Sequence, residues 1–148
     1  MAEKTEAEKF MEAHQKERDV LFANEGFVIG VLQVVCGGSL FAALAQSETL
    51  VKLSGKLPFL SFLTLMGIGL ASAVLSAYWK HQYKMWDVKA GASHADGRPG
   101  EATKRWERAG CYLRAMRLAM PISVVSIFIA LGGLVLAAWA RVLCTHVQ

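Results

Sequence analysis

The stretch Trp79–Leu118, WKHQYKMWDVKAGASHADGRPGEATKRWERAGCYLRAMRL, separates two long uncharged runs and holds nine of the sixteen Lys and Arg residues of the chain. The uncharged runs on its two sides cover residues 57–79 and 118–140, and a third run covers residues 26–47. Each run reaches the roughly 20 residues that cross a bilayer as a helix. The sequence therefore predicts an all-α integral membrane protein with three transmembrane helices.

The composition agrees with a membrane protein. Of the 148 residues, 54% are hydrophobic, above the roughly 45 to 50% of an ordinary soluble domain, and the mean hydropathy is +0.35. The formal net charge is +4, but the basic residues gather beside the uncharged runs. This distribution is typical of membrane topology, so we expect no nucleic-acid partner.

The distribution of Lys and Arg also predicts the orientation. The N-terminal segment 1–25 and the connector 80–117 together hold thirteen, whereas the link 48–56 and the tail 141–148 hold three. Because basic residues accumulate on the cytoplasmic side, we expect an N-in, C-out protein with an external link and tail. The expected location is the cell membrane, inner or plasma.

The connector has the pattern of a helical hairpin. Apolar residues recur in steps of three and four from Ala102 to Met120 and from Trp79 to Ala90, and residues 91–100 have the composition of a loop. The connector has nine basic and four acidic residues, a net charge of +5, while segment 1–25 has four basic and seven acidic, a net charge of −3. We expect the second and third helices to extend into a cytoplasmic hairpin that packs with the N-terminal helix.

Small and polar residues form stripes along two of the predicted spans, at helical steps of three and four. Such stripes allow close helix contact in membranes. Two interpretations remain open: packing within one three-helix bundle, or the lining of a narrow pore around an oligomer axis. The candidate residues are Gly30, Gln33, Gly37, Ser123, Ser126, Ala130 and Gly133.

The connector offers two further sets of candidates. Arg114 and Arg117 lie at the start of the third span, where basic side chains contact anionic lipid headgroups. Aromatic and basic residues of the hairpin are candidates for a cytoplasmic interaction, including contact with the acidic N-terminal helix. They are Tyr83, Trp86, Trp106, Arg105 and Arg108.

Catalytic chemistry is not indicated. No Asp, Glu, Lys, Arg or His lies within a span, the four His residues are dispersed, and Cys36, Cys111 and Cys144 have no metal-ligand spacing. We therefore expect no enzyme activity, catalytic residue, metal site or cofactor. The expected function is a small homo-oligomeric membrane protein, a pore-forming or membrane-perturbing effector or channel gated by its cytoplasmic bundle. The alternative is a non-catalytic accessory or scaffolding subunit that packs with other membrane subunits.

Long helices that cross the membrane, flanked by cytoplasmic helices, make this organisation similar to the SLATT-type effectors of bacterial conflict systems. The resemblance covers architecture only, and the third span departs from their two-span pattern.

Overall fold

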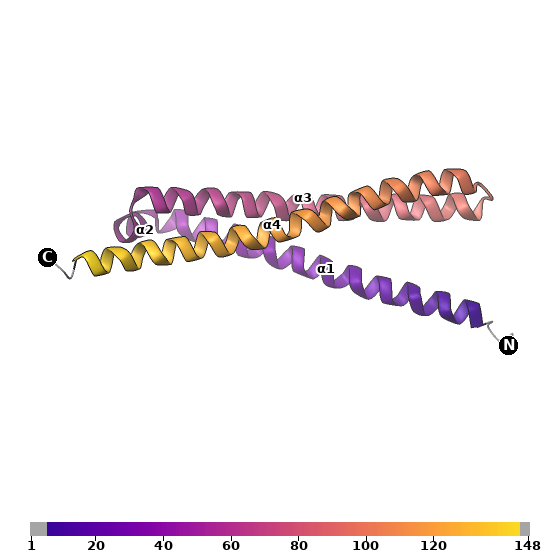
Figure 1. The fold of residues 1–148 in the computed structure, drawn as a ribbon, viewed down its shortest axis with the longest axis horizontal. Helices are drawn as coiled ribbons and strands as arrows, with labels where there is room; N and C mark the ends of the chain where they lie inside the picture. Colours follow the sequence, from indigo (N-terminus) through magenta and orange to yellow (C-terminus); the bar gives the residue numbers. More distant parts are fainter. Residues whose placement is uncertain (1–5, 146–148) are drawn as a thin grey trace.

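The computed structural model describes the backbone of residues 6–145 and the side chains of residues 15–144 apart from Glu17. This part of the chain forms four helices, α1 (Glu6–Ala45), α2 (Ser47–Ser54), α3 (Lys56–Ala95) and α4 (Pro99–Thr145) (Figure 1). Three of them, α1, α3 and α4, are long and apolar enough to cross a membrane. The prediction of an all-helical protein with three candidate spans is therefore confirmed.

Helices α3 and α4 form a long antiparallel hairpin that is the frame of the molecule (Figure 1). They contain 40 and 47 residues, so at 1.5 Å per residue they measure about 60 and 70 Å. The hydrocarbon core of a bilayer is only about 30 Å thick. Both helices are thus long enough to cross a bilayer and to project well beyond it.

The turn of the hairpin is shorter than the sequence suggests. The expected loop at 91–100 contracts to residues 96–98, because α3 continues to Ala95 and α4 begins at Pro99. Gly97 has a φ of 69°, and the amides of Gly97 and Arg98 donate to the carbonyls of His94 and Ser93 at 3.1 and 2.9 Å. This is a Schellman C-cap, which ends α3 within one residue and lets Pro99 start the next helix.

The link at 48–56 is also mostly helical, since α2 occupies residues 47–54. Gly55 separates α2 from α3 with a φ of 96°. The guanidinium of Arg141 near the end of α4 donates to the carbonyl of Lys52 at 2.7 Å. A cation at the C-terminus of α2 satisfies free carbonyls and opposes the helix dipole, so α4 holds the link in place.

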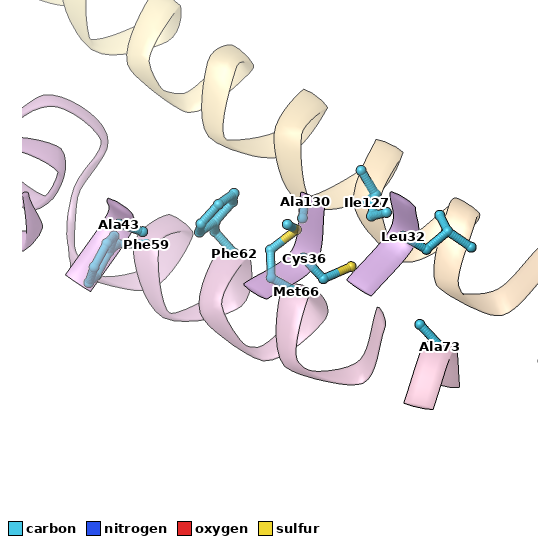
Figure 2. Packing of buried hydrophobic residues seen from close by; sticks show 9 residues of the cluster. All are labelled: Leu32, Cys36, Ala43, Phe59, Phe62, Met66, Ala73, Ile127 and Ala130. Atoms are coloured by element: carbon cyan, nitrogen blue, oxygen red, sulfur yellow. The ribbon is translucent and has the colours of Figure 1, made fainter. Parts of the chain in front are cut away.

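The core within the apolar runs joins α1, α3 and α4 (Figure 2). It combines large side chains of α3 with both large and small side chains of the other two helices, and the small ones let the backbones approach closely. Hydrophobicity cannot hold helices together in lipid, so van der Waals packing at such sites must contribute most of the stability. The core residues are Leu32, Cys36, Ala43, Phe59, Phe62, Met66, Ala73, Ile127 and Ala130.

At the hairpin end, small residues form the contact between α3 and α4. Ala90, Ala102 and Ala109 are buried there, together with Met116. Trp106 belongs to the apolar residues that recur from Ala102 to Met120 and were expected to lie on one helix face, but 44% of this side chain is exposed. Alanines bring the two backbones too close together for an indole, so Trp106 lies at the edge of the contact.

Helix α1 runs antiparallel to α3 and separates from it towards the N-terminus (Figure 1). Described side-chain contacts with the hairpin occur at Arg18 and Phe22. Before them, residues 6–17 include only Phe10 and Met11 as large apolar residues, so this part of the helix has little apolar surface to bury. A full-length three-helix bundle at this end thus stays a prediction, and the side chains of residues 1–14 lie outside the described ones.

Candidate functional site

The three long helices meet at the level where their uncharged runs begin or end. Glu25 precedes the run in α1, Lys80 follows the run in α3, and Arg117 precedes the run in α4. We call this region the junction. Its residues are Arg18, Leu21, Phe22, Glu25, Lys80, Tyr83, Asp87, Leu113 and Arg117.

Polar and aromatic contacts hold α1 against α3 at the junction. The guanidinium of Arg18 donates to the hydroxyl of Tyr83 at 2.9 Å and to the carboxylate of Asp87 at 3.1 Å. The rings of Phe22 and Tyr83 lie 5.0 Å apart between their centroids. Arg18 and Phe22 are four residues apart, as are Tyr83 and Asp87, so each pair occupies one helix face. We call these four residues the clasp.

Lys80 adds a contact from α3 to the backbone of α1. Its ammonium donates to the carbonyl of Phe22. A Cβ atom added at Gly26 would lie 2.6 Å from Lys80 Nζ, so glycine leaves the space that this lysine occupies. Burial lowers the pKa of Lys80 below its ordinary value, Lys84 adds to the lowering, and Glu25 opposes it. The charged form of Lys80 is therefore stabilised by its polar neighbours, the carbonyl of Phe22 and the carboxylate of Glu25.

Two cavities adjoin the clasp, and Arg18, Phe22 and Tyr83 line both of them. The first, of about 440 Å³, extends towards the tip of the hairpin and reaches Trp106 and Gly91. The second, of about 210 Å³, lies among all three helices at the level of the junction. Its remaining lining residues are Leu21, Glu25, Leu113 and Arg117.

In the described part of the chain, the second cavity combines a buried acceptor without a hydrogen-bond donor and an exposed guanidinium. Oxygen Oε2 of Glu25 is buried and accepts no hydrogen bond from any described residue. Among the described residues, Arg117 forms no ion pair or hydrogen bond through its side chain. A buried carboxylate oxygen without a donor costs free energy, so this cavity is chemically incomplete.

Of the five cytoplasmic interaction candidates, two line the first cavity with α1. Tyr83 belongs to the clasp, and Trp106 lies beside it. Trp86 is engaged within the hairpin, with Lys89 and Arg108 each 5.1 Å from its ring centroid. Arg105 joins α4 to α3 by donating to the carbonyl of Lys89 at 3.0 Å.

The two stripes of small residues have different surroundings. Ser123, Ser126 and Ala130 are buried, and the hydroxyl of Ser123 donates to the carbonyl of Gly69 at 2.8 Å. These residues of α4 are covered within the single chain.

The stripe on α1 is more open. A Cβ atom added at Gly30 or Gly37 would have no neighbour within 4 Å, and the same holds for Gly133 on α4. Gln33 is partly exposed, and among the described residues its amide makes no hydrogen bond. The structure therefore leaves this polar, small-residue face of α1 only partly covered.

Several residues of the junction and the core were not identified from the sequence. Arg18 and Glu25 are two of many charges in an acidic segment, and no local pattern distinguishes them. Cys36 of α1 packs against Gly69 of α3, with 3.1 Å between the sulfur and a Cβ atom added at Gly69. The small-residue pair Gly69 and Ala73 could have indicated the contact between Cys36 and Gly69. The overlapping pair Gly67 and Ala71 has the same spacing, however, so the sequence does not show which pair faces α1.

Comparison of this chain with models of protein families, with curated proteins and with solved structures finds no match.

Proposed function

We propose that this protein is a homo-oligomeric membrane channel whose pore forms between copies and whose opening is controlled at the hairpin end. The observation that carries the proposal is the partly exposed face of Gly30, Gln33 and Gly37 on α1, where added Cβ atoms at the two glycines would have no neighbour within 4 Å. An amide placed in hydrocarbon without a partner costs several kcal/mol, roughly 4 to 8 on a cyclohexane scale. A second helix that contacts this face, or water in a pore, removes that cost.

A second copy of α1 fits this face. Glycines at positions 30 and 37 let another backbone approach, and interhelical hydrogen bonds of glutamine contribute about 0.6 to 2 kcal/mol each in membranes. In a closed ring each Gln33 occupies the same position, so the amides line the axis. Amide and backbone groups can line an ion path without any charged side chain.

The clasp provides a means of control in this proposal. It ties α1, which carries the pore face, to the hairpin of α3 and α4. We place the hairpin and the N-terminus in the cytoplasm, because thirteen of the sixteen basic residues lie on that side. A signal that moves the hairpin then moves α1 through Arg18 and Phe22.

Conductance of purified protein in planar bilayers tests the proposal. We expect discrete openings, and we expect Gln33→Leu to abolish them or change their unit conductance by severalfold while the oligomer persists. Thr64→Val is the matched control, because Thr64 is an exposed hydroxyl of α3 that bonds its own helix at Leu60. Tyr83→Phe, which removes one of the two acceptors of Arg18, should change the open probability and leave the unit conductance unchanged. A monodisperse monomer without conductance contradicts the proposal.

An accessory subunit is the second candidate, and the C-terminal half of α4 favours it. Gly132 and Gly133 have open space around them, and the neighbouring Leu131 and Leu136 are exposed. This face is suited to an unlike membrane helix. Native mass spectrometry after gentle solubilisation separates the two functions, since a complex of identical copies supports the channel. Unlike subunits that Gly133→Leu releases support the accessory role.

A further inference from the structure

The 210 Å³ cavity of the junction lies where a lipid headgroup would lie. Its lining residues Glu25 and Arg117 each immediately precede an uncharged run, and Tyr83 lies four residues after the end of the run 57–79. The polar surface of a bilayer begins where such runs end. The cavity is therefore at headgroup depth whichever side of the membrane it faces, and whether or not copies form a pore.

The free charges in this cavity are of opposite sign. Glu25 contributes a buried carboxylate oxygen without a donor, and Arg117 contributes a guanidinium without an acidic partner among the described residues. The other cation of the lining, Arg18, is already bonded to Tyr83 and Asp87. The nearby ammonium of Lys80 donates to the carbonyl of Phe22. Neither of these cations completes the shell of Glu25.

We propose that this cavity binds the zwitterionic headgroup of an aminophospholipid of the phosphatidylethanolamine class. The primary ammonium of the headgroup donates to Oε2 of Glu25, and its phosphodiester accepts from the guanidinium of Arg117. Leu21 and Leu113 also line the cavity, about one helical turn farther from the uncharged runs than Glu25 and Arg117, so they border the headgroup on the side away from the acyl chains. One molecule then provides both a donor to Glu25 Oε2 and an acceptor for the guanidinium of Arg117.

Other headgroups fit less well. A purely anionic headgroup brings its charge next to the carboxylate of Glu25, which repels it. A choline headgroup has no N–H group, so it leaves Oε2 without a donor. The proposal thereby distinguishes the two lipid candidates on α4, because Arg114 does not line this cavity and lies instead in a surface depression with Trp106 and Gly110.

Native mass spectrometry of the full-length protein ejected from nanodiscs tests the assignment without any substitution. The nanodiscs contain equal parts of phosphatidylethanolamine, its N-methyl and N,N-dimethyl forms, and phosphatidylcholine. We expect the bound fraction to fall as methyl groups replace N–H donors, with phosphatidylethanolamine exceeding phosphatidylcholine about fivefold, as for the loss of one hydrogen bond while the charge is kept. Equal retention of all four lipids overturns the proposal.

Variants identify the two contacts. Glu25→Gln should remove the preference for phosphatidylethanolamine over phosphatidylcholine and keep binding of both, whereas Arg117→Gln should weaken both severalfold. Glu48→Gln and Arg114→Gln are matched controls beside other parts of the spans and should change neither quantity. An unchanged preference in Glu25→Gln protein that elutes and gives a helical spectrum like the natural protein contradicts the site.

A soluble zwitterion has the same polar groups as this headgroup, so a competition arm separates the two sources. Phosphoethanolamine without acyl chains is added to the nanodiscs at the same concentration as the lipid. Retention of bound phosphatidylethanolamine supports a lipid site, and its displacement at concentrations comparable with those of the lipid overturns the assignment to a membrane lipid.

Discussion

Gly69 of α3 lies in close contact with both α1 and α4. A Cβ atom there would meet Cys36 Sγ of α1 at 3.1 Å and the carbonyl oxygen of Ser123 of α4 at 3.5 Å. At the same contact, the hydroxyl of Ser123 donates a hydrogen bond to the carbonyl of Gly69. The absence of a side chain at position 69 thus lets two helices pack on α3 at one level.

Gly69→Leu should disrupt this contact. The added side chain has no space between Cys36 and Ser123, and overpacking of this kind costs about 1 to 3 kcal/mol. We expect a lower midpoint of thermal unfolding, followed by circular dichroism in detergent. Gly67→Leu is the control, because a Cβ atom at Gly67 has open space around it. Equal midpoints of the two variants would show that the contact at Gly69 contributes nothing.

At the scale of the element, the hairpin depends on one glycine at its tip while it tolerates another within α3. Gly97 takes a left-handed conformation, with a φ of 69°, that the Schellman cap requires. Gly91 lies inside α3, has no positive φ, and an added Cβ atom there would touch nothing within 4 Å. The two glycines were part of one expected loop, and the structure gives them opposite roles.

Alanine at these two positions should therefore have opposite effects on stability. Gly97→Ala strains the turn by about 1 to 2 kcal/mol, while Gly91→Ala favours the helix by about 0.5 to 1 kcal/mol. Hydrogen exchange of the amides of α3 and α4 near the tip measures both changes, and it should be faster in the first variant and slower in the second. Faster exchange in both would place Gly91 in the turn.

At the scale of the whole molecule, native cysteines report the orientation that the basic residues predict. Cys111 lies in the hairpin and Cys144 near the end of α4, both exposed, while Cys36 is buried. With the N-terminus and hairpin in the cytoplasm, a membrane-impermeant maleimide applied to intact cells should label Cys144 alone. Cys111 should react only after permeabilisation.

Single replacements identify the labelled residue. Cys144→Ser should abolish labelling of intact cells, and Cys111→Ser should abolish the additional labelling after permeabilisation. Labelling of Cys111 in intact cells would show that the topology is the reverse of the predicted one. It would also place the clasp and the lipid cavity on the external side.

Much of the fold could be predicted from the sequence alone, because each span depends on the summed transfer free energies of consecutive residues. Transfer of about 20 uncharged residues into a bilayer is favourable residue by residue, so three runs suffice to predict three spans. The continuation of the second and third helices beyond the membrane follows from the periodicity of Trp79–Leu118. The capped end of α3 at Gly97 was missed only because Gly91 and Gly100 gave the same composition signal.

The stripes on α1 and α4 show what only the tertiary structure decided. Both have small and polar residues in the same steps of three and four, so periodicity cannot tell which is covered. Packing against α3 buries Ser123 and Ala130 and leaves Gly30 and Gly37 open. The junction has the same origin, since Glu25, Tyr83 and Arg117 meet only when three helices far apart in sequence come together. Hydrophobic runs are properties of single segments, whereas a cavity and its unpaired charges are properties of their packing.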